Sequence, residues 1–421
     1  MNVSVVRTAL AGSLVAILLA SSACGQTELP PARSVVDDGS TPESSEPVAV
    51  SSTTEVPATT TDPSEPSVTT PSAFAIFAPS TTTPSVTTPS VTTADVPDAA
   101  VADWEDITTS LVGIESTCGN VSFLAADPAS DDVLVNIARF GLFTLADDAT
   151  GWFPIGADGD RIDHRTQWIE FDPEVPPRYW VSGAYGDGVF RTDDGGATFA
   201  RLPGIDHVDR VAVDMTDPER RTLLAGSHED RALWKSTDGG QTWTDISPSL
   251  PLGSGFSSVP VVLAPDVYLL GTYRSDGAGI FRSEDGGQSW TRIFDDEGIG
   301  APVVTEDFMA WNRGSGGLVV STDGGVSFDA PGPSPGRPSP TLVRGPGGTL
   351  VTTFEQGVVV TPDLGRTWAV VGQPLPFEAD GVAYSAARDE LYVWRHSCEF
   401  GEQGNPVAPA SILRATVEAT E

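Results

Sequence analysis

From Trp104 onward, the chain alternates short apolar segments with glycine-rich turns. Segments such as "GLFTL", "ALWKS" and "GIFRS" are each preceded by a second apolar segment, such as "VLVNIA", "TLLAGS" or "YLLGTY". These runs are too short for helices, show no helical period and are bounded by turn residues, which is typical of antiparallel strands joined in hairpins. The pattern therefore predicts an all-β domain.

One turn sequence recurs along this domain. Five copies are clear, namely "TDDGGATF" (192–199), "STDGGQTW" (236–243), "SEDGGQSW" (283–290), "STDGGVSF" (321–328) and "TPDLGRTW" (361–368). A degenerate sixth copy, "LADDATGW", retains Asp147 and Trp152. The aspartates of the six turns are spaced by about 38 to 47 residues, which is the length of one four-stranded propeller blade.

The turn chemistry gives these aspartates a structural role. A carboxylate at this position can accept hydrogen bonds from turn N–H groups and from the neighbouring Ser or Thr hydroxyls. Glycine supplies the positive φ angles that the turn needs, and the terminal Trp or Phe fills apolar space beside the hairpin. We therefore expect structural rather than catalytic roles for five residues: Asp194, Asp238, Asp285, Asp323 and Asp363.

The S-x-D-x-G-x-T-W turn resembles the Asp-box, or BNR, repeat of a superfamily of propellers. That superfamily includes sialidases, xyloglucan-degrading glycoside hydrolases, sortilin-type receptors and photosystem II assembly factors. The resemblance implies four antiparallel strands per blade, with the box joining the third strand to the fourth. Counting a final blade without a box gives seven blades; the alternative is six, with the degenerate first or unboxed last repeat discarded.

Two similar segments indicate how the ring closes. "WEDITTSL" at 104–111 matches "WTDISPSL" at 243–250, which follows a box and forms a fourth strand with its exit. The last blade, from about residue 380, has three strands before the chain ends. We therefore expect 104–111 to supply its missing outer strand by pairing with residues 411–419, because such closure satisfies an open strand edge. The folded domain is then 104–421.

The residues before this domain suggest export. Residues 1–23 have one basic residue, a short apolar run and small residues before Cys24, which is the layout of a signal peptide. With cysteine at the cleavage point, the segment resembles a bacterial lipoprotein, although Ser21 stands where leucine is usual. A lipidated Cys24 would tether the protein on the outer side of the cytoplasmic membrane, in the cell envelope. The alternative is ordinary cleavage after Ala23.

Residues 24–103 are rich in Ser, Thr and Pro, with "PSVTT" present three times. Such a composition cannot bury enough apolar surface to offset the entropy of ordering, so we expect a disordered linker. In an exported and oxidising setting, the two remaining cysteines, Cys118 and Cys398, are expected to form a disulfide across the ring closure.

The chain carries a formal net charge of −35, with a single lysine. This charge argues against nucleic acid as a partner and against adhesion to anionic lipid, so membrane contact is expected only through the anchor. A glycan or an envelope or secreted protein remains as a possible partner, and we expect a monomer. The sequence contains no G-x-S-x-G, H-E-x-x-H, P-loop or C-x-x-C motif, and we expect no metal and no cofactor.

Topology points to the ligand face. If the boxes occupy one face, the connections between second and third strands occupy the other, where related enzymes carry their sites. Arginine is frequent in these connections, and its planar fork suits carboxylate, sulfate or phosphate. Ordinary pairing of these arginines with acidic neighbours is the alternative. The candidate ligand-binding residues are Arg139, Tyr185, His228, Glu229, Arg231, Tyr273, Arg274, Arg313, Glu355 and Arg395.

Three functional classes remain open, because propellers host many functions. The favoured one is a binding or assembly module on the cell surface without catalysis. The first alternative is a glycoside hydrolase of sialidase-like or xyloglucanase-like type, although the sialidase Arg-Ile-Pro motif is missing and no catalytic residue can be chosen. The second alternative is a structural envelope protein.

Overall fold

The computed structural model describes residues 100–421 except 112, 115–119, 157–161, 163–165, 184–187, 228–230, 252–258, 273–276, 337, 397–409 and 419–421. All the described residues belong to one compact unit. Within these residues, no helix is both long and apolar enough to span a membrane. Apart from two one-turn 3₁₀ segments, η1 (Ser247–Ser249) and η2 (Pro346–Gly348), the regular structure is entirely β.

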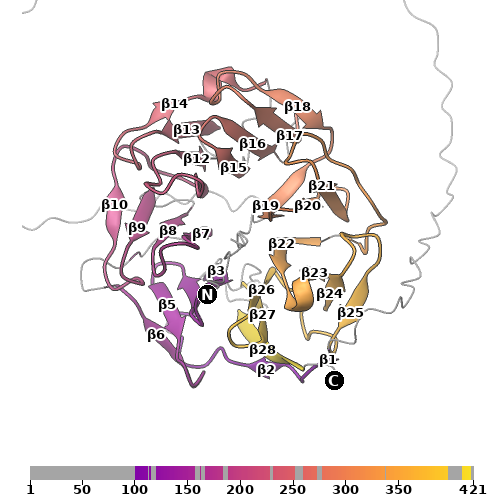
Figure 1. The fold of residues 1–421 in the computed structure, drawn as a ribbon. Coiled ribbons are helices and arrows are strands. Elements are labelled where there is room, and N and C mark those ends of the chain that lie inside the picture. Colours follow the sequence, from indigo (N-terminus) through magenta and orange to yellow (C-terminus); the bar gives the residue numbers. More distant parts are fainter. Residues whose placement is uncertain are drawn as a thin grey trace, which may run out of the picture. The chain divides into compact units, whose positions relative to one another are not determined.

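Seven antiparallel sheets are arranged as the blades of a ring (Figure 1). Blade 1 consists of β3 (Val121–Ala126), β4 (Val133–Ile137), β5 (Gly141–Leu145) and β6 (Trp152–Pro154). Blade 2 consists of β7 (Trp168–Phe171), β8 (Tyr179–Ser182), β9 (Val189–Thr192) and β10 (Ala200–Leu202). Blade 3 consists of β11 (Arg210–Val213), β12 (Leu223–Ser227), β13 (Ala232–Ser236) and β14 (Thr244–Asp245). Blade 4 consists of β15 (Val259–Ala264), β16 (Val267–Thr272), β17 (Gly279–Ser283) and β18 (Thr291–Phe294). Blade 5 consists of β19 (Gly298–Val304), β20 (Met309–Arg313) and β21 (Leu318–Ser321). Blade 6 consists of β22 (Pro338–Arg344), β23 (Leu350–Phe354), β24 (Gly357–Thr361) and β25 (Ala369–Val371).

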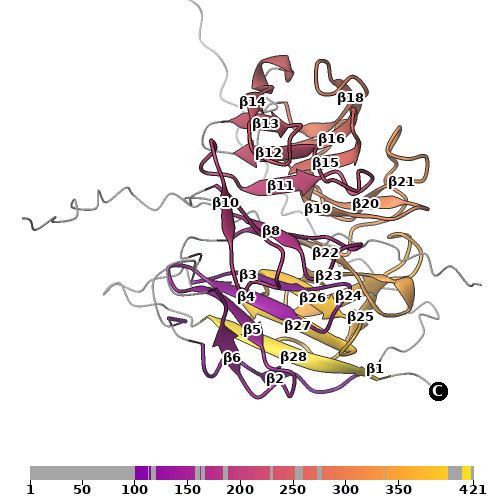
Figure 2. The ribbon, with the colours of Figure 1, turned by 60° about the vertical axis from the view of Figure 1, so that its left-hand side comes forward.

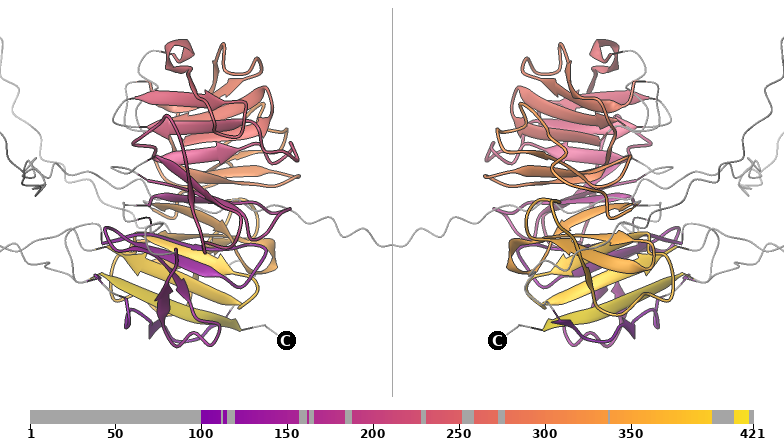
Figure 3. Two further views of the ribbon diagram at one scale, coloured as in Figure 1. Left: turned by 90° about the vertical axis from the view of Figure 1, so that its left-hand side faces the viewer. Right: turned by 90° about the vertical axis from the view of Figure 1, so that its right-hand side faces the viewer.

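Blade 7 consists of β26 (Gly381–Ser385), β27 (Glu390–Arg395), β28 (Ser411–Glu418) and the N-terminal strands β1 (Ala100–Val101) and β2 (Glu105–Asp106). The seven-bladed propeller predicted from the repeat is thus confirmed, and the six-bladed alternative is wrong. The first strand of each blade lies toward the centre of the ring (Figure 1). Side views show the sheets of neighbouring blades stacked face to face (Figure 2, Figure 3).

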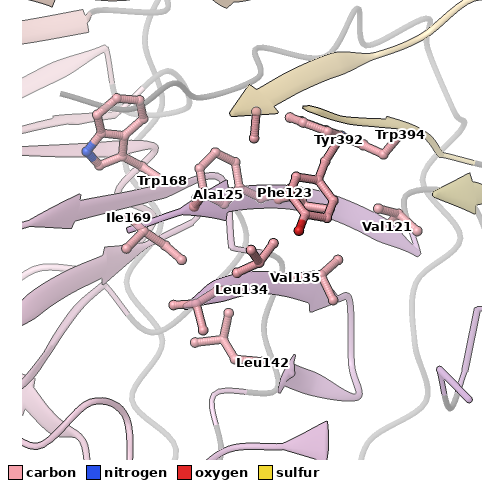
Figure 4. Packing of buried hydrophobic residues seen from close by; sticks show 14 of the residues in the cluster. Val121, Phe123, Ala125, Leu134, Val135, Leu142, Trp168, Ile169, Tyr392 and Trp394 are labelled. Atoms are coloured by element: carbon pink, nitrogen blue, oxygen red, sulfur yellow. The ribbon is translucent and has the colours of Figure 1, made fainter. Parts of the chain in front are cut away.

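The core lies between the blades, where apolar side chains from facing sheets meet. Phe123 of β3 packs against Trp168 of blade 2 and Trp394 of blade 7, with ring centroids 6.4 Å apart in both pairs. All three are fully buried (Figure 4). Since burying one such side chain stabilises the fold by roughly 1.5–3 kcal/mol, these contacts bind three consecutive blades around the seam.

The five clear repeat turns have one hydrogen-bonding pattern. In each, the Ser or Thr that ends the third strand donates its hydroxyl to the aspartate two residues on, at 2.7–2.9 Å. The same aspartate accepts the hydroxyl of the residue four positions after it, at 2.6–2.8 Å. The glycine two residues after the aspartate donates its N–H back to the first hydroxyl. The aspartate therefore organises the hairpin through both of its oxygens.

These hydrogen bonds favour the ionised aspartate. Donation from Thr242, through its hydroxyl and its N–H, lowers the pKa of Asp238 to about 2, and donation from Ser289 lowers that of Asp285 to about 2. In the degenerate turn of blade 1, Asp148 rather than Asp147 accepts the Thr150 hydroxyl, at 2.7 Å. The pKa of Asp148 is lowered for the same reason. The degenerate turn therefore has a shorter contact, between residues two positions apart, in place of the box pattern.

The N-terminal segment closes the ring as predicted. Glu105 and Asp106 of β2 pair with Arg414 and Leu413 of β28, and the ladder continues upstream, where β1 pairs with Val417 and Glu418. Arg414 donates two hydrogen bonds to Glu105, at 2.9 and 2.8 Å. The outer edge of the last blade is therefore covered by the opposite end of the chain.

The segment after β2 also serves the next blade. Trp152 of blade 1 donates its indole N–H to the Ile107 carbonyl at 2.8 Å, and its backbone N–H to the Ser110 hydroxyl at 2.9 Å. In blade 4, Trp290 also donates to a serine hydroxyl, that of Ser249 at 3.2 Å, but through its indole N–H rather than its backbone N–H. Ser110 and Ser249 hold the same place in "WEDITTSL" and "WTDISPSL". The match between the two sequences therefore extends to the serine that contacts the next tryptophan, although the donating group differs.

Blade 5 departs from the four-stranded pattern in the described residues. Its outermost element is a single bridge between Val320 and Asp329 instead of a fourth strand. The chain that follows contains Pro331, Pro333 and Pro335. Because proline has no N–H to donate, this segment cannot continue a ladder. The Pro333 carbonyl instead accepts a hydrogen bond from Trp368 of blade 6, at 3.3 Å.

Candidate functional site

The two ends of the strands form two different faces. The turn face carries the recurring turns and the connections between first and second strands. The loop face carries the connections between second and third strands and those between blades, and its second-to-third connections are residues 138–140, 183–188, 228–231, 273–278, 314–317, 355–356 and 396–410. The predicted candidate residues that the structure describes fall in or beside five of these connections, so the loop face is where a common site would form.

The structure describes half of the predicted ligand-binding residues. Tyr185, His228, Glu229, Tyr273 and Arg274 lie outside the described residues, as do Cys24, Cys118 and Cys398. The other five lie at the loop-face ends of five different blades: Arg139 in blade 1, Arg231 in blade 3, Arg313 in blade 5, Glu355 in blade 6 and Arg395 in blade 7. They are thus distributed around the loop face.

Three of these residues share an unusual backbone conformation. Arg139, Arg231 and Glu355 have φ angles of 71°, 50° and 49°, in the left-handed region that favours glycine. All three are solvent-exposed. A left-handed conformation costs an ordinary residue roughly 1–2 kcal/mol relative to the right-handed one. The tight connections therefore carry charged side chains at positions where glycine would be less strained.

The remaining two described candidates are held by neighbours. Arg313 donates its Nε–H to the Gly316 carbonyl at 2.9 Å and lies 3.5 Å from the Asp296 carboxylate. The Arg395 guanidinium lies over the ring of Phe377, 5.7 Å from its centroid. Arg313 thus fits the interpretation of an arginine paired with an acidic neighbour, whereas Arg395 has an aromatic partner.

Sequence reasoning missed a charged cluster on two innermost strands, which we call the inner polar cluster and define as Trp168, Glu170 and Arg210. The Arg210 guanidinium stacks on the Trp168 ring, 3.6 Å from its centroid, and Trp168 donates its indole N–H to Glu170 at 2.7 Å. Arg210 Nη2 lies 4.0 Å from Glu170 Oε2. The cluster joins blade 2 to blade 3 at the centre of the ring.

Burial governs the chemistry of this cluster. The side chains of Glu170 and Arg210 are only 8% and 5% exposed. Loss of hydration raises the pKa of Glu170 to about 7, although Arg210 and the Trp168 N–H both act to lower it. Burial likewise lowers the pKa of Arg210 to about 10. The sequence signal was available, because one acidic and one basic residue interrupt the apolar strands "QWIEF" and "RVAV".

Polar residues near the ends of two second strands connect blade 1 to blade 2 and blade 2 to blade 3. Asn136 accepts the N–H of Thr166 in the connection to blade 2, at 3.1 Å. Ser182 of blade 2 accepts the N–H of Val211 in blade 3, at 3.2 Å. Each of these acceptors is fully buried. Their inter-blade bonds give them a structural role beside the loop face.

A histidine and an aspartate meet where blade 7 reaches the loop face. His396 Nδ1 lies 2.5 Å from Asp380 Oδ2, which also accepts the His396 backbone N–H at 2.7 Å. A carboxylate at Nδ1 orients an imidazole and leaves Nε2 for another partner. Among the described residues, no group of three or more His, Cys, Asp or Glu side chains could hold a metal ion.

A pocket of about 430 Å³ opens on the turn face, between blades 3 and 4. Its lining residues are Thr216, Asp217, Pro218, Arg221, Thr222, Thr237 and Pro265. Within this pocket, Arg221 donates a hydrogen bond from its Nε to the Asp217 carboxylate, at 2.9 Å. This contact helps to lower the pKa of Asp217 to about 2. The pocket's charged groups therefore neutralise each other.

No protein-family model and no curated protein matches the sequence. Solved structures match the fold. A GH74 enzyme from Niastella koreensis is similar with a TM-score of 0.50 and 18% identity, over 66% of this chain and 52% of that one. The extracellular domain of a putative one-component system from B. thetaiotaomicron is similar with a TM-score of 0.50 and 12% identity, over 74% of this chain and 40% of that one.

The structure of U3-55K is also similar, with a TM-score of 0.50 and 11% identity, over 75% of this chain and 98% of that one. The chain spans about half or less of the GH74 enzyme and of the one-component system domain. At these identities the comparisons show the β-propeller fold, and the function has to be argued from the site.

Proposed function

We propose that the protein is an exported binding propeller that takes its ligand on the loop face. The observation that carries this proposal is the exposure of Arg139, Arg231 and Glu355 at left-handed backbone positions. Strain of this kind in a tight connection points to a side chain retained for a purpose other than stability. Arginine in particular suits carboxylate, sulfate or phosphate groups, so the proposed ligand is an anionic glycan or an acidic surface of an envelope or secreted protein.

Export and anchoring are part of the same proposal. The apolar run before Cys24 supports a lipoprotein signal peptide, and the Ser/Thr/Pro-rich residues 24–103 support a spacer that holds the propeller away from the membrane. The likeness to an extracellular bacterial domain supports an exported position for such a fold. Mass spectrometry of the N-terminal peptide tests the anchor: diacylglycerol on Cys24 supports it, and a free thiol there contradicts it.

Replacing the strained residues by glycine tests the binding role. Arg139→Gly and Arg231→Gly relieve backbone strain, so stability should hold or rise by about 1 kcal/mol. Affinity for the anionic members of a panel of sialylated, uronic and neutral glycans should fall tenfold or more. Ala149→Gly on the turn face is the matched control, because Ala149 also has a positive φ, of 55°. Unchanged affinity in both arginine variants would contradict the proposed site.

Glycoside hydrolysis is a second candidate, favoured by the raised pKa of Glu170, about 7, which is typical of a general acid. The likeness to a GH74 enzyme is compatible with it. Turnover of any glycan in the panel, abolished by Glu170→Gln without loss of binding, would favour the hydrolase. Binding without turnover favours the binding module, and no response to any glycan favours the protein partner.

A further inference from the structure

The pocket on the turn face, which we call the turn-face pocket, lies between two blades whose connections differ greatly in length. In blade 3, nine residues (214–222) join β11 to β12, and they supply five of the seven lining residues. In blade 4, only Pro265 and Asp266 join β15 to β16. Blade 4 therefore has no long connection to pack against that of blade 3, and a space of about 430 Å³ is left beside it.

The junction one blade earlier shows which group such a space can hold. Asp172 follows β7 in blade 2, as Asp214 follows β11 in blade 3, and each accepts the N–H of the residue two positions on. Arg220, from the long connection of blade 3, reaches back to Asp172 and donates from Nε at 3.0 Å and from Nη2 at 2.8 Å. The aspartate of blade 2 is thus neutralised by a guanidinium that comes from the next blade.

Asp214 has the same place in its blade, but the described residues supply no such partner. Its side chain is fully buried, and no described residue donates a hydrogen bond to its Oδ2 atom. The two-residue turn of blade 4 contains no arginine that could take the place of Arg220. Because a buried carboxylate without a counter-ion is costly, we expect Asp214 to attract a cation from outside the chain.

Hydrogen bonds place Asp214 directly behind the wall of the turn-face pocket. Thr216, a lining residue, donates its hydroxyl and its N–H to Asp214 Oδ1, at 2.6 and 2.9 Å. Asp214 in turn donates its N–H to the carbonyl of Thr222, which also lines the pocket, at 2.9 Å. Because the hydrogen of the Thr216 hydroxyl is used in this contact, the hydroxyl oxygen can still accept a hydrogen bond from a ligand.

The charged groups that line the pocket balance each other, but carboxylates around them add negative charge. Arg221 pairs with Glu219 as well as with Asp217, at 3.3 and 2.9 Å. Glu219 and Asp214 therefore leave these four residues with a net negative charge. Since Asp214 is buried, water and salt screen its charge less than that of a surface group. A cation in the pocket is thus attracted to the wall that Asp214 supports.

We propose that the turn-face pocket takes the guanidinium group of an arginine side chain from a basic partner protein. The guanidinium enters between blades 3 and 4, donates to threonine oxygens of the lining and compensates the charge of Asp214, in the manner of Arg220 at Asp172. Its several N–H donors suit a lining of hydroxyl groups. The formal net charge of −35 attracts such a partner at long range. The pocket lies on the face opposite to the loop face and stands independently of the proposed function.

Binding of short capped peptides to the full-length protein tests this site, with affinities measured by ligand-observed NMR titration. The peptide acetyl-Gly-Arg-Gly-amide should bind, and its citrulline counterpart, which keeps the shape but lacks the charge, should bind at least tenfold more weakly. The lysine counterpart should bind at least threefold more weakly, because an ammonium lacks the planar fork of donors. Arginine and citrulline peptides of equal affinity, or arginine and lysine peptides of equal affinity, would overturn the proposal.

Variants assign the binding to the pocket. Asp214→Asn keeps an acceptor for Thr216 but removes the charge, so affinity for the arginine peptide should fall at least tenfold. Glu284→Gln removes one exposed charge from a turn outside the pocket and, as the matched control, should change affinity less than twofold. If Asp214→Asn does not fold, Thr237→Trp at an exposed lining residue should abolish binding by filling the pocket. Unchanged affinity in Asp214→Asn or in Thr237→Trp, or an equal fall in Glu284→Gln, contradicts the site.

Discussion

Two segments of this propeller, Trp104–Leu111 and Trp243–Leu250, perform the same task with different connectivity. In both, an aspartate accepts the N–H two residues on, at 2.8 Å, and a following serine accepts a hydrogen bond from the tryptophan of the next blade. The second segment continues directly from the third strand of its own blade. The first comes from the other end of the chain. Local sequence thus determines the contacts of the segment, and chain topology determines which blade receives them.

The comparison also shows what an interrupted blade requires. Blade 3 holds its outer strand through a hairpin, so the cost of closing the loop is small. Blade 7 lacks that hairpin and has instead the Arg414–Glu105 hydrogen bonds and the contact of Trp152 with Ile107 and Ser110. Arg388 adds a link from blade 7 to the Asp131 and Ala146 carbonyls of blade 1, at 2.6 and 3.2 Å. The seam therefore combines a backbone ladder between β28 and the N-terminal strands with side-chain contacts that take the place of the missing hairpin.

Deleting residues 100–111 should have the largest effect on stability. It removes the outer strand of blade 7 and the acceptors of Trp152, so stability should fall by several kcal/mol or the ring should fail to fold. Chemical denaturation followed by tryptophan fluorescence measures the loss. A synthetic peptide of residues 100–111 added to the deleted protein should restore part of it. A deletion that leaves the unfolding midpoint unchanged would show that the strand is dispensable.

Removal of the predicted disulfide between Cys118 and Cys398 should come next. Both cysteines lie outside the described residues, but the strands nearest to them, β3 and β27, meet across the seam through Phe123 and Trp394. Cys118→Ser should cost about 2–4 kcal/mol, because the cross-link restricts the unfolded chain. Cys398→Ser should cost the same, and the double variant no more. Two free thiols in non-reduced exported protein would contradict the prediction.

Acid should weaken the internal blades through their turns. Asp238 has a folded-state pKa of about 2, below its ordinary value, so its contribution to stability is present above about pH 4. That contribution is lost as the pH falls through about 2. Asp238→Asn should therefore reduce the pH dependence of the melting temperature between pH 4 and pH 2, compared with the natural protein. An identical pH profile in the two proteins would mean that the turn does not couple to unfolding.

Arg414→Met should have the smallest effect. Its partner Glu105 is 61% exposed, and an ion pair with one exposed partner is screened by water and salt. The expected loss is at most about 1 kcal/mol, most of it abolished in high salt. Arg221→Met, which removes an exposed pair on the turn face, is the matched control. A loss of several kcal/mol of unfolding free energy in Arg414→Met would contradict this expectation and would show that this one side chain dominates the stability of the ring closure.

The repeat could be predicted from the sequence because each turn is stabilised by residues that are close together along the chain. Five aspartates with the same neighbours at blade spacing predicted the turns and the strand order, and the tryptophan-led segment at 104–111 predicted the closure. The count of seven blades also required the degenerate first repeat and the unboxed last one. The same reasoning missed that in the degenerate turn Asp148, and not Asp147, accepts the Thr150 hydroxyl. It also missed the bridge that replaces a fourth strand in blade 5, where prolines remove the donors.

The candidate site could be predicted from the sequence only in part. The sequence placed arginines in the connections of one face, but it could not show that Arg139 and Arg231 adopt left-handed backbone angles or that Asp296 lies beside Arg313. Those features depend on the length and course of each connection, which no repeat imposes. Candidates outside the described residues, such as Tyr185 and Arg274, remain predictions.

By itself, then, the sequence determined what depends on neighbours along the chain: the strands, the turns and the order of the blades. Only the tertiary structure decided what depends on residues far apart in it. Glu170 and Arg210 are separated by a whole blade length in sequence. Only the stacking of blade 3 on blade 2 brings Arg210 onto the Trp168 ring and within 4.0 Å of Glu170. Burial then changes their chemistry, because the surrounding blades remove the water that would otherwise solvate both charges.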